Sequence, residues 1–187
     1  MSIDLTLHSS VVAPKLLGSV LHGPNGSGRI VEVEAYGGAD DPASHSARGV
    51  TPRTEPVFGP AGVLYVYLIY GMYHCANIVT GPEGDGQAVL IRAVEPVEIT
   101  REMRAARPKA RRDVDLANGP GKLCQALGID RAHDRLDLSS ESSPVRLQLA
   151  KPVPTDSIEQ STRIGLSVSK ETPWRWHVRG NVWVSKG

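Results

Sequence analysis

The most regular feature of the chain is a run in which apolar and polar positions alternate. Residues 28–36 read GRIVEVEAY. This alternation has the two-residue period of a β-strand, whose successive side chains point to opposite faces. We therefore predict a strand with one apolar face and one face that carries two carboxylates. The apolar face holds Val31, Val33 and Ala35, and the other holds Ile30, Glu32, Glu34 and Tyr36.

Further apolar runs follow in the central part of the chain. Residues 62–69 and 87–93 are rich in strand-forming side chains and are bounded by glycine or proline, which predicts two more strands. Residues 73–79 can add a strand between them. Because such closely spaced strands pair antiparallel, we expect a curved antiparallel sheet.

The remaining segments predict helices, a further strand and loops. Residues 97–107 have helical spacing with acidic residues first and basic residues last, as the helix dipole favours, and residues 119–127 predict a shorter helix. Residues 174–184 return to strand-like alternation. Residues 40–60 contain four prolines and little periodicity, so they predict a long loop of the kind that often carries function. Residues 139–143 predict a mobile surface loop.

Composition favours one domain of mixed type. A chain of 187 residues falls within the usual size of one domain, and no internal repeat or change of composition divides it. Its 19 glycines and 14 prolines, against a single phenylalanine, favour turns and short elements over a long helical bundle. We therefore expect a single mixed α/β domain over residues 1–187.

Cysteine usage and the apolar segments bear on the compartment. Cys75 and Cys124 lack the spacing of metal ligands or of a disulfide framework, so we expect free thiols in a reducing compartment. Residues 1–10 lack the basic start and apolar run of a secretory signal. Residues 62–80 include four tyrosines, a histidine and an asparagine, which are costly in lipid. We expect a cytoplasmic protein without a membrane span, associated with the nucleoid if the source is bacterial.

Charge alone is weak evidence for a nucleic-acid partner, because the formal net charge is only +1. Residues 101–112, however, read REMRAARPKARR, with six basic residues and one acidic residue. This segment suits a phosphate-facing surface, and an ordinary solvated helix end fits it equally well.

The clustering of tyrosines is the least ordinary feature of the composition, since four of the five lie in residues 65–73. Tyr65 and Tyr67 share one strand face, whereas Tyr70 precedes Gly71 at an expected turn, where a side chain can project. A hydrophobic core whose hydroxyl groups reach water would explain the cluster. An aromatic wall that stacks on a nucleobase, beside a side chain that wedges into a base stack, would explain it as well.

Three kinds of charged residue are candidates for chemistry. Glu32 and Glu34 lie about 7 Å apart by strand geometry, a separation at which carboxylates can divide acid and base roles in glycoside hydrolysis. Exposed glutamates on an edge strand are the more common outcome. His45 follows in the loop, where a structural hydrogen-bonding role is more common than a catalytic one. Arg92 lies within an apolar strand, and a buried arginine requires an anionic or polar partner.

Several longer segments together resemble the alkyladenine, or 3-methyladenine, DNA glycosylase family of bacteria and animals. The resemblance is specific, because the segments are long, keep the family's order and span most of the chain. It implies a single mixed α/β domain with a curved antiparallel sheet, flanking helices and a protruding β-hairpin that enters the DNA minor groove. The matching segments are GRIVEVEAY, His45 followed by SARGVTPR, GVLYVYLIYGMYHCANIV, GDGQAVLIRAVEP, NGPGKLCQALGI, and RIGLS followed by PWRWHVRGN.

The resemblance also implies roles for individual residues, including a choice of Glu34 over Glu32 that strand geometry could not make. It implies a general base with two groups that hold its water, aromatic walls for an extruded base, and a residue whose bulk disfavours the amine of normal guanine. The catalytic group is Glu34 with Arg92 and the backbone carbonyl of Ile164; the walls are Tyr36, His45 and Tyr67; the gate is Asn77; the DNA contacts are Tyr70 as the wedge, Met72, Thr51 and Lys122.

The implied activity is that of a monofunctional glycosylase of base excision repair. It would flip alkylated purines, with deaminated purines as a further class, from double-stranded DNA and leave an abasic site without metal or cofactor. No lysine stands where a Schiff base would be expected. A monomer is the simplest state, because the active face must approach DNA alone. Two alternatives remain open: a non-catalytic nucleic-acid binding module that stacks bases on the tyrosines, and a hydrolase of free nucleosides.

Overall fold

A computed structural model describes residues 3–186 of the chain, so the parts of our expectations that concern residues 1, 2 and 187 lie outside the described residues. Its strands form one sheet in the order β3-β4-β5-β2-β1-β6, with β8 beside β2 and β7 beside β8, and the pairs are antiparallel. The strands are β1 (Val20–Gly23), β2 (Gly26–Tyr36), β3 (Leu64–Ile69), β4 (Tyr73–Thr80), β5 (Gln87–Pro96), β6 (Arg146–Gln148), β7 (Ile158–Ser161) and β8 (Arg175–Val178).

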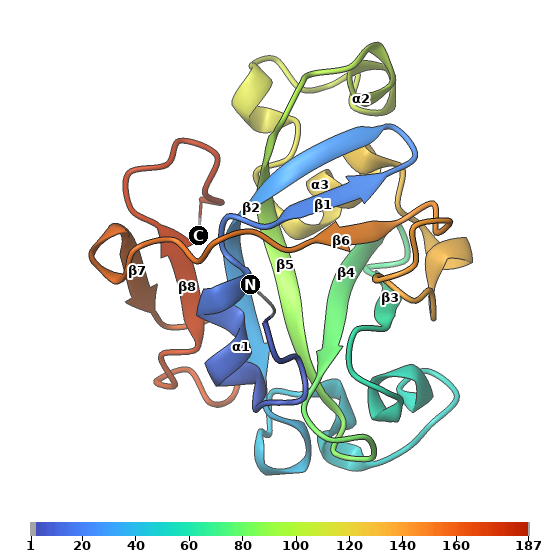
Figure 1. Cartoon of the computed structure of the whole chain (residues 1–187), viewed down its shortest axis with the longest axis vertical. Helices are drawn as coiled ribbons and strands as arrows, with labels where there is room; N and C mark the ends of the chain where they lie inside the picture. Colours follow the sequence, from blue (N-terminus) through green and yellow to red (C-terminus); the bar gives the residue numbers. More distant parts are fainter. Residues whose placement is uncertain (1–2, 187) are drawn as a thin grey trace.

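The sheet is strongly curled, as Figure 1 shows by the way β1 and β6 run across the direction of β4 and β5. The three central strands predicted from the apolar runs are neighbours in the order β3-β4-β5, which confirms the predicted curved antiparallel sheet. Mixed α/β architecture is confirmed as well, because helices pack on this sheet.

β2 lies inside the sheet. It pairs with β5 along one edge, while β1 and then β8 pair with successive parts of its other edge. Glu32 and Glu34 therefore have a strand on each side, and both residues are fully buried. The alternative of exposed glutamates on an edge strand is wrong, because β8 covers the second edge of β2. The sequence of β2 alone cannot show this pairing, since β8 lies far along the chain.

Helices α1 and α3 cover the sheet, and α2 lies at its end (Figure 1). α3 confirms the helix expected at residues 119–127. α2 is shorter than the predicted 97–107, because the Thr100 hydroxyl caps its first turn by accepting the Met103 N–H at 3.1 Å. α1 was not predicted, since Pro14 in its interior weakens the helical pattern. The helices are α1 (Ser9–Leu16), α2 (Arg101–Ala106) and α3 (Pro120–Leu127).

The loops contain short 3₁₀ helices, and the irregular segment expected at residues 40–60 is confirmed. Of the strand expected at residues 174–184, only β8 is extended, because the chain turns after Val178. The mobility expected of residues 139–143 stays a prediction. The 3₁₀ helices cover Gly38–Asp40, His45–Arg48, Glu55–Phe58, Asp113–Asp115, Arg131–His133 and Thr155–Ser157.

Alternation along the four strands β2 to β5 separates two faces. One face packs against α1 and α3 and forms the main core, which includes Val33 and Ala35 of β2 and Val89 and Ile91 of β5. The intervening side chains turn to the opposite face, where polar and aromatic groups gather. These are Glu34, Tyr36, Tyr65, Tyr67, Cys75, Asn77, Leu90 and Arg92.

Two irregularities interrupt the pairing of β2 with β5. The register skips Val31 on β2 and Arg92 on β5, so each is a bulged residue. Ile30 belongs to the main core together with Val33, whereas Val31 joins a smaller cluster with Trp183. The predicted placement of Ile30 on the carboxylate face, and of Val31 beside Val33, is therefore wrong, because strict alternation does not continue through a bulge.

Candidate active site

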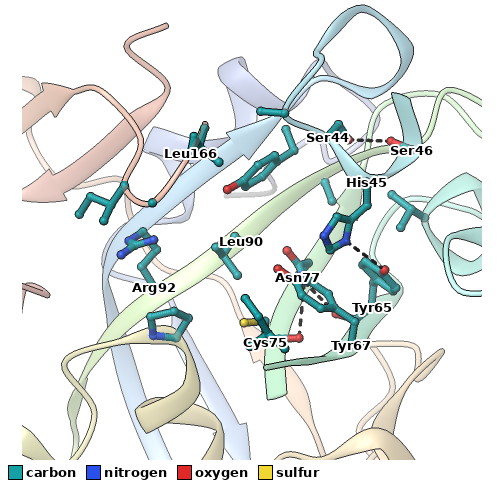
Figure 2. Close-up of a pocket in the computed structure, with 18 of the residues that line it drawn as sticks. Ser44, His45, Ser46, Tyr65, Tyr67, Cys75, Asn77, Leu90, Arg92 and Leu166 are labelled. Carbon is teal, nitrogen blue, oxygen red and sulfur yellow. Dashed lines mark hydrogen bonds between the residues drawn. The ribbon is translucent and has the colours of Figure 1, made fainter. Parts of the chain in front are cut away.

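A pocket of about 370 Å³ opens on the polar face of the sheet. Strands β2 to β5 supply its floor, and residues 43–46 and 164–166 line it from two loops. In Figure 2, Arg92 and Leu166 lie on one side of this pocket, and His45 and Tyr67 lie on the other. Its volume falls within the range of small-molecule sites.

Glu34 is fully buried behind the wall of this pocket, and its polar contacts come from residues that line it. The Tyr36 hydroxyl donates to Oε2 at 3.0 Å, and the Ile164 N–H donates to Oε1 at 2.8 Å. Arg92 Nη1 lies 3.2 Å from the same Oε1. Burial, and then the charge of Glu34, raise the pKa of Tyr36, so its hydroxyl stays protonated and can donate.

The residues expected around the general base therefore do meet at one carboxylate. The contact with Ile164 is made by its N–H, and a role for its carbonyl stays a prediction. Glu32, the other carboxylate of the pair, is turned away from the pocket-lining residues Tyr36 and Ile164 and toward the C-terminal segment. The geometry thus distinguishes two carboxylates that the sequence pattern left equivalent.

Arg92 connects these two buried carboxylates, which confirms that a buried arginine here has anionic partners. Its Nε donates to Glu32 Oε1 at 3.0 Å, and its Nη1 contacts Glu34. Burial alone would raise the pKa of Glu32, but Arg92, the Ser185 N–H and Arg175 hold it below its ordinary value. Glu32 is therefore ionised at neutral pH.

Aromatic rings from separate elements line the same pocket. Tyr36 comes from β2, Tyr67 from β3 and His45 from the loop after β2, and the His45 and Tyr67 rings meet edge to face at 4.5 Å. Burial and the nearby Arg53 cation lower the pKa of His45, so its imidazole is neutral at pH 7. The neutral ring adds no positive charge to this side of the pocket.

Asn77 lines the pocket from β4 and is only 4% exposed. Its Nδ2 donates to the backbone carbonyl of Tyr65 at 3.1 Å, across the β3–β4 pair. This hydrogen bond fixes the side chain against the strand, so its bulk occupies a defined place in the pocket. The gate function expected of Asn77 stays a prediction.

The hairpin of β3 and β4 ends in an exposed apolar tip. Tyr70 (φ 53°) and Gly71 (φ 69°) both have positive φ, and a non-glycine residue in this region costs on the order of 1 kcal/mol or more. The turn holds Tyr70 83% exposed and Met72 64% exposed. Two large apolar side chains at such a tip leave most of their surface uncovered by the chain, so they are available to contact another molecule.

A second hollow of about 380 Å³ lies beside this tip. Tyr70 borders both hollows, and Tyr73, Arg107 and Lys122 line the second one. The Lys122 ammonium donates to Asn118 Oδ1 at 2.8 Å, at the start of α3. Two cations beside an exposed aromatic tip make a suitable place for a phosphate, and the phosphate contact expected of Lys122 stays a prediction.

Thr51 does not line either hollow. It is exposed in the loop after β2, where its N–H donates to the Thr54 hydroxyl at 2.9 Å. In the basic segment 101–112, two arginines form ion pairs with neighbouring aspartates at 3.0 and 2.8 Å, so part of its charge is balanced within the chain. Neither observation tests a DNA contact.

Arg163 is a site residue that the sequence did not reveal. It forms a buried two-point ion pair with Asp41 at 2.6 and 2.9 Å, and its guanidinium lies 4.9 Å from the centre of the Tyr36 ring. Arg163 directly precedes Ile164, whose N–H contacts Glu34. The ion pair with Asp41 therefore holds this loop in place against the loop that follows β2. A lone arginine in an irregular segment carries no signal of so distant a partner.

The described residues, 3–186, place no cluster of three or more histidine, cysteine, aspartate or glutamate side chains where it could hold a metal ion. None of the residues that line the first pocket is a lysine. Cys75 and Cys124 are both free, as predicted, and the structure shows that both are buried. Within the same part of the chain, no helix has the length and apolar character needed to cross a membrane.

Comparisons with known proteins agree with this geometry. The family model described as methylpurine-DNA glycosylase matches residues 4–182. A protein of Burkholderia lata, named as a candidate 3-methyladenine DNA glycosylase, is 50% identical over 175 residues, covering 93% of this chain and 84% of that protein. Proteins with the same name from Myxococcus xanthus (49% identical, covering 95% and 88%) and Bacillus cereus (44% identical, covering 94% and 93%) are also similar. The chain therefore belongs to the methylpurine-DNA glycosylase family and is a hydrolase that acts on N-glycosyl bonds.

Proposed function

We propose that this protein is a monofunctional DNA glycosylase of base excision repair that acts on alkylated purines flipped out of double-stranded DNA. The observation that carries the proposal is the carboxylate of Glu34, which is held by Arg92, Tyr36 and Ile164 directly behind a pocket of about 370 Å³, large enough to admit a nucleobase. Deaminated purines form a second class of substrate, and the protein acts as a monomer without a metal or cofactor.

The proposed chemistry is a displacement by water at C1′ of the flipped nucleotide. Glu34 takes a proton from the water, the water oxygen bonds to C1′, and the N-glycosidic bond breaks with its electron pair going to the purine. An alkylated purine such as 3-methyladenine already carries positive charge, so it leaves as a neutral base without a protein acid. The Glu34 carboxylate also stabilises the cationic character that develops on the sugar.

Recognition of the lesion rests on the rings that line the pocket. An electron-poor, cationic base between aromatic faces gains stacking and cation–π attraction, worth on the order of 1 kcal/mol when water is excluded. Tyr36, His45 and Tyr67 supply these faces. Tyr70 replaces the extruded nucleotide in the base stack, Met72 contacts the groove beside it, and Lys122 and Thr51 contact phosphates.

The proposed function is tested by incubating the protein with a duplex that contains one 3-methyladenine or 7-methylguanine, and separately with the corresponding free nucleoside. We expect free base from the duplex, undiminished by EDTA, and at least about 100-fold slower release from the nucleoside. Tight duplex binding without base release would instead identify a binding module. Equal release from the free nucleoside would identify a nucleoside hydrolase.

Replacing Tyr70 with serine is expected to weaken stable base flipping. The side chain is exposed, so folding should change little, whereas stacking on a base contributes about 1–3 kcal/mol. We expect binding to lesion duplex to weaken about tenfold, measured by titration with a fluorescent base at the lesion. Tyr70→Phe keeps the ring and serves as the matched control, which should bind like the wild type. Unchanged binding by Tyr70→Ser would rule out the wedge.

Replacing Asn77 with alanine is expected to admit guanine-derived bases. The change removes bulk from the pocket, so the ratio of 7-methylguanine to 3-methyladenine excision should rise about tenfold, within the range of one pocket contact. The ratio is measured on duplexes that differ only in the lesion, which cancels any loss of active protein. Thermal unfolding reports the cost of the lost hydrogen bond to Tyr65. An unaltered ratio would remove the proposed gate.

A further inference from the structure

We propose that Glu32 is a positioning residue for base excision. Together with Ser185 of the C-terminal segment, it orients the guanidinium of Arg92, which contacts both Glu32 and Glu34. The inference rests on the proposed function, because it assigns a role within the same reaction. Of the residues that hydrogen-bond to Glu32, only Arg92 lines the pocket, so Glu32 acts through Arg92 and not on the substrate.

Four hydrogen bonds engage both oxygens of the Glu32 carboxylate. Its Oε1 accepts from Arg92 Nε at 3.0 Å, Arg175 Nε at 2.7 Å and the Ser185 hydroxyl at 2.8 Å. Its Oε2 accepts from the Ser185 N–H at 2.6 Å. The Ser185 hydroxyl also lies 3.3 Å from Arg92 Nη2, so the same C-terminal residue contacts both members of the pair.

The position of Arg92 depends on these contacts because the residue is bulged out of the β2–β5 register. A bulge redirects a side chain, but it does not fix the rotation of a long, flexible guanidinium. Glu32 and Ser185 hold Nε and Nη2, which leaves Nη1 as the nitrogen that contacts Glu34. Glu32 thus orients Nη1 of the guanidinium toward Glu34, the proposed general base.

The charges in this network are nearly balanced. Glu32 and Glu34 carry two negative charges, and Arg92 and Arg175 carry two positive charges. If Glu32 were neutral, both arginines would act on Glu34 alone, and a base so strongly paired takes a proton less readily. Glu32 therefore keeps Glu34 reactive, because it pairs with positive charge that would otherwise act on Glu34 alone.

The C-terminal segment reaches the network through its own packing. Trp183 is 9% exposed and packs with Val31, Ala93 and Leu116 in the smaller core cluster. Ser185 follows two residues later and is also buried. Because Trp183 is packed in this cluster, the N–H and hydroxyl of Ser185 are positioned to hydrogen-bond to Glu32.

The pH profile of excision separates this role from a purely structural one. The titratable and charged groups around Glu34 are Arg92 from β5, Tyr36 on its own strand, Cys75 from β4, Arg163 from the loop before Ile164 and Arg175 across the β2–β8 pair. Those around Glu32 are Arg92, Arg175 and, across the same pair, His177 with its partner Glu159. Removing one negative charge from this set should move the acidic limb of the rate profile to lower pH. Removing one positive charge should move it to higher pH.

The test compares single-turnover excision by Glu32→Gln and Arg175→Gln over a range of pH, on an alkylated duplex bound at saturation. For Glu32→Gln we expect a rate about 10- to 100-fold lower at pH 7, lesion binding within about threefold of wild type, and an acidic limb about one unit lower. For Arg175→Gln, which leaves Glu32 paired with Arg92, we expect the limb to move in the opposite direction. Glu32→Asp keeps the charge and should return the limb to its wild-type position.

Each outcome bears on one claim only. Lack of excision by the wild type would contradict the proposed function and not the role of Glu32. Active wild type with limbs that do not move in either variant would contradict the positioning role, whatever the loss of rate. If Glu32→Gln fails to fold, Arg175→Gln still decides the matter, because an unmoved or lowered limb would overturn the proposal.

Discussion

Glu34→Gln is expected to abolish base excision while leaving lesion binding largely intact. Glutamine keeps the size of the side chain and an oxygen that can accept the Ile164 N–H, which lies 2.8 Å from the carboxylate in the wild type. It removes the proposed general base and the negative charge that we propose stabilises the sugar cation. General-base catalysis contributes about 10²–10⁴-fold, so we expect a rate at least about 10³-fold lower.

Single-turnover release of free base from an alkylated duplex measures this effect, and binding to the same duplex is measured in parallel. Glu141→Gln is the matched control, because Glu141 is exposed in a loop outside the proposed site and should excise at the wild-type rate. Excision by Glu34→Gln at a rate near that of the wild type would mean that another group activates the water.

Arg92→Met is expected to cause the largest loss of stability. The substitution leaves Glu34 without its ion pair and removes one of the cations that Glu32 contacts, with both carboxylates fully buried. Removing one partner of a buried ion pair typically costs about 3–5 kcal/mol. Urea unfolding at pH 7 should show a decrease of this size in the free energy of unfolding. Excision should also fall, because Glu34 loses the group that holds it.

The loss of stability should depend on pH in a defined direction. In the wild type the pKa of Glu32 is lowered against the effect of burial, chiefly by Arg92, so its contribution is fully present above about pH 4.3, the ordinary value for glutamate. The contribution is lost as pH falls through the lower folded pKa. The difference between wild type and Arg92→Met should therefore be largest at neutral pH and shrink below about pH 4.

Arg104→Met provides the control for this measurement. Arg104 forms an ion pair with Asp113 in which both side chains are more than half exposed, and such pairs contribute about 0–1 kcal/mol. A loss from Arg92→Met no greater than from Arg104→Met would contradict the view that Arg92 neutralises buried carboxylates.

The predictable part of the fold was the part that rests on local pattern. Runs of strand-forming side chains in residues 62–69, 73–79 and 87–93 identified β3, β4 and β5 and their pairing, because these strands follow one another along the chain. The period of two seen in residues 28–36 failed within β2, where the bulge at Val31 moves Ile30 into the main core. A bulge depends on the partner strand, so residues 28–36 carry no sign of it.

The candidate site, like the fold, has a part that local sequence predicts and a part that depends on distant segments. A buried arginine with an acidic partner followed from one charged residue in an apolar strand, and Arg92 does contact two carboxylates. The contacts that depend on distant segments could not be predicted, since Arg163 reaches Asp41 and Ser185 reaches Glu32 only through tertiary folding. The resemblance to a known family, and not strand geometry, separated Glu34 from Glu32.

Trapping with borohydride tests most directly the claim that water, and not a protein amine, displaces the purine. The protein is incubated with an alkylated duplex in the presence of sodium borohydride, and free base, strand cleavage and protein–DNA adducts are measured together. We expect free base in proportion to the lesion and no adduct. In a parallel sample without borohydride, which would reduce the abasic aldehyde to an alkali-stable alcohol, we expect a strand that stays intact until alkali is added. A borohydride-dependent adduct between protein and DNA, or strand cleavage that accompanies base loss, would contradict a Glu34-activated water as the nucleophile.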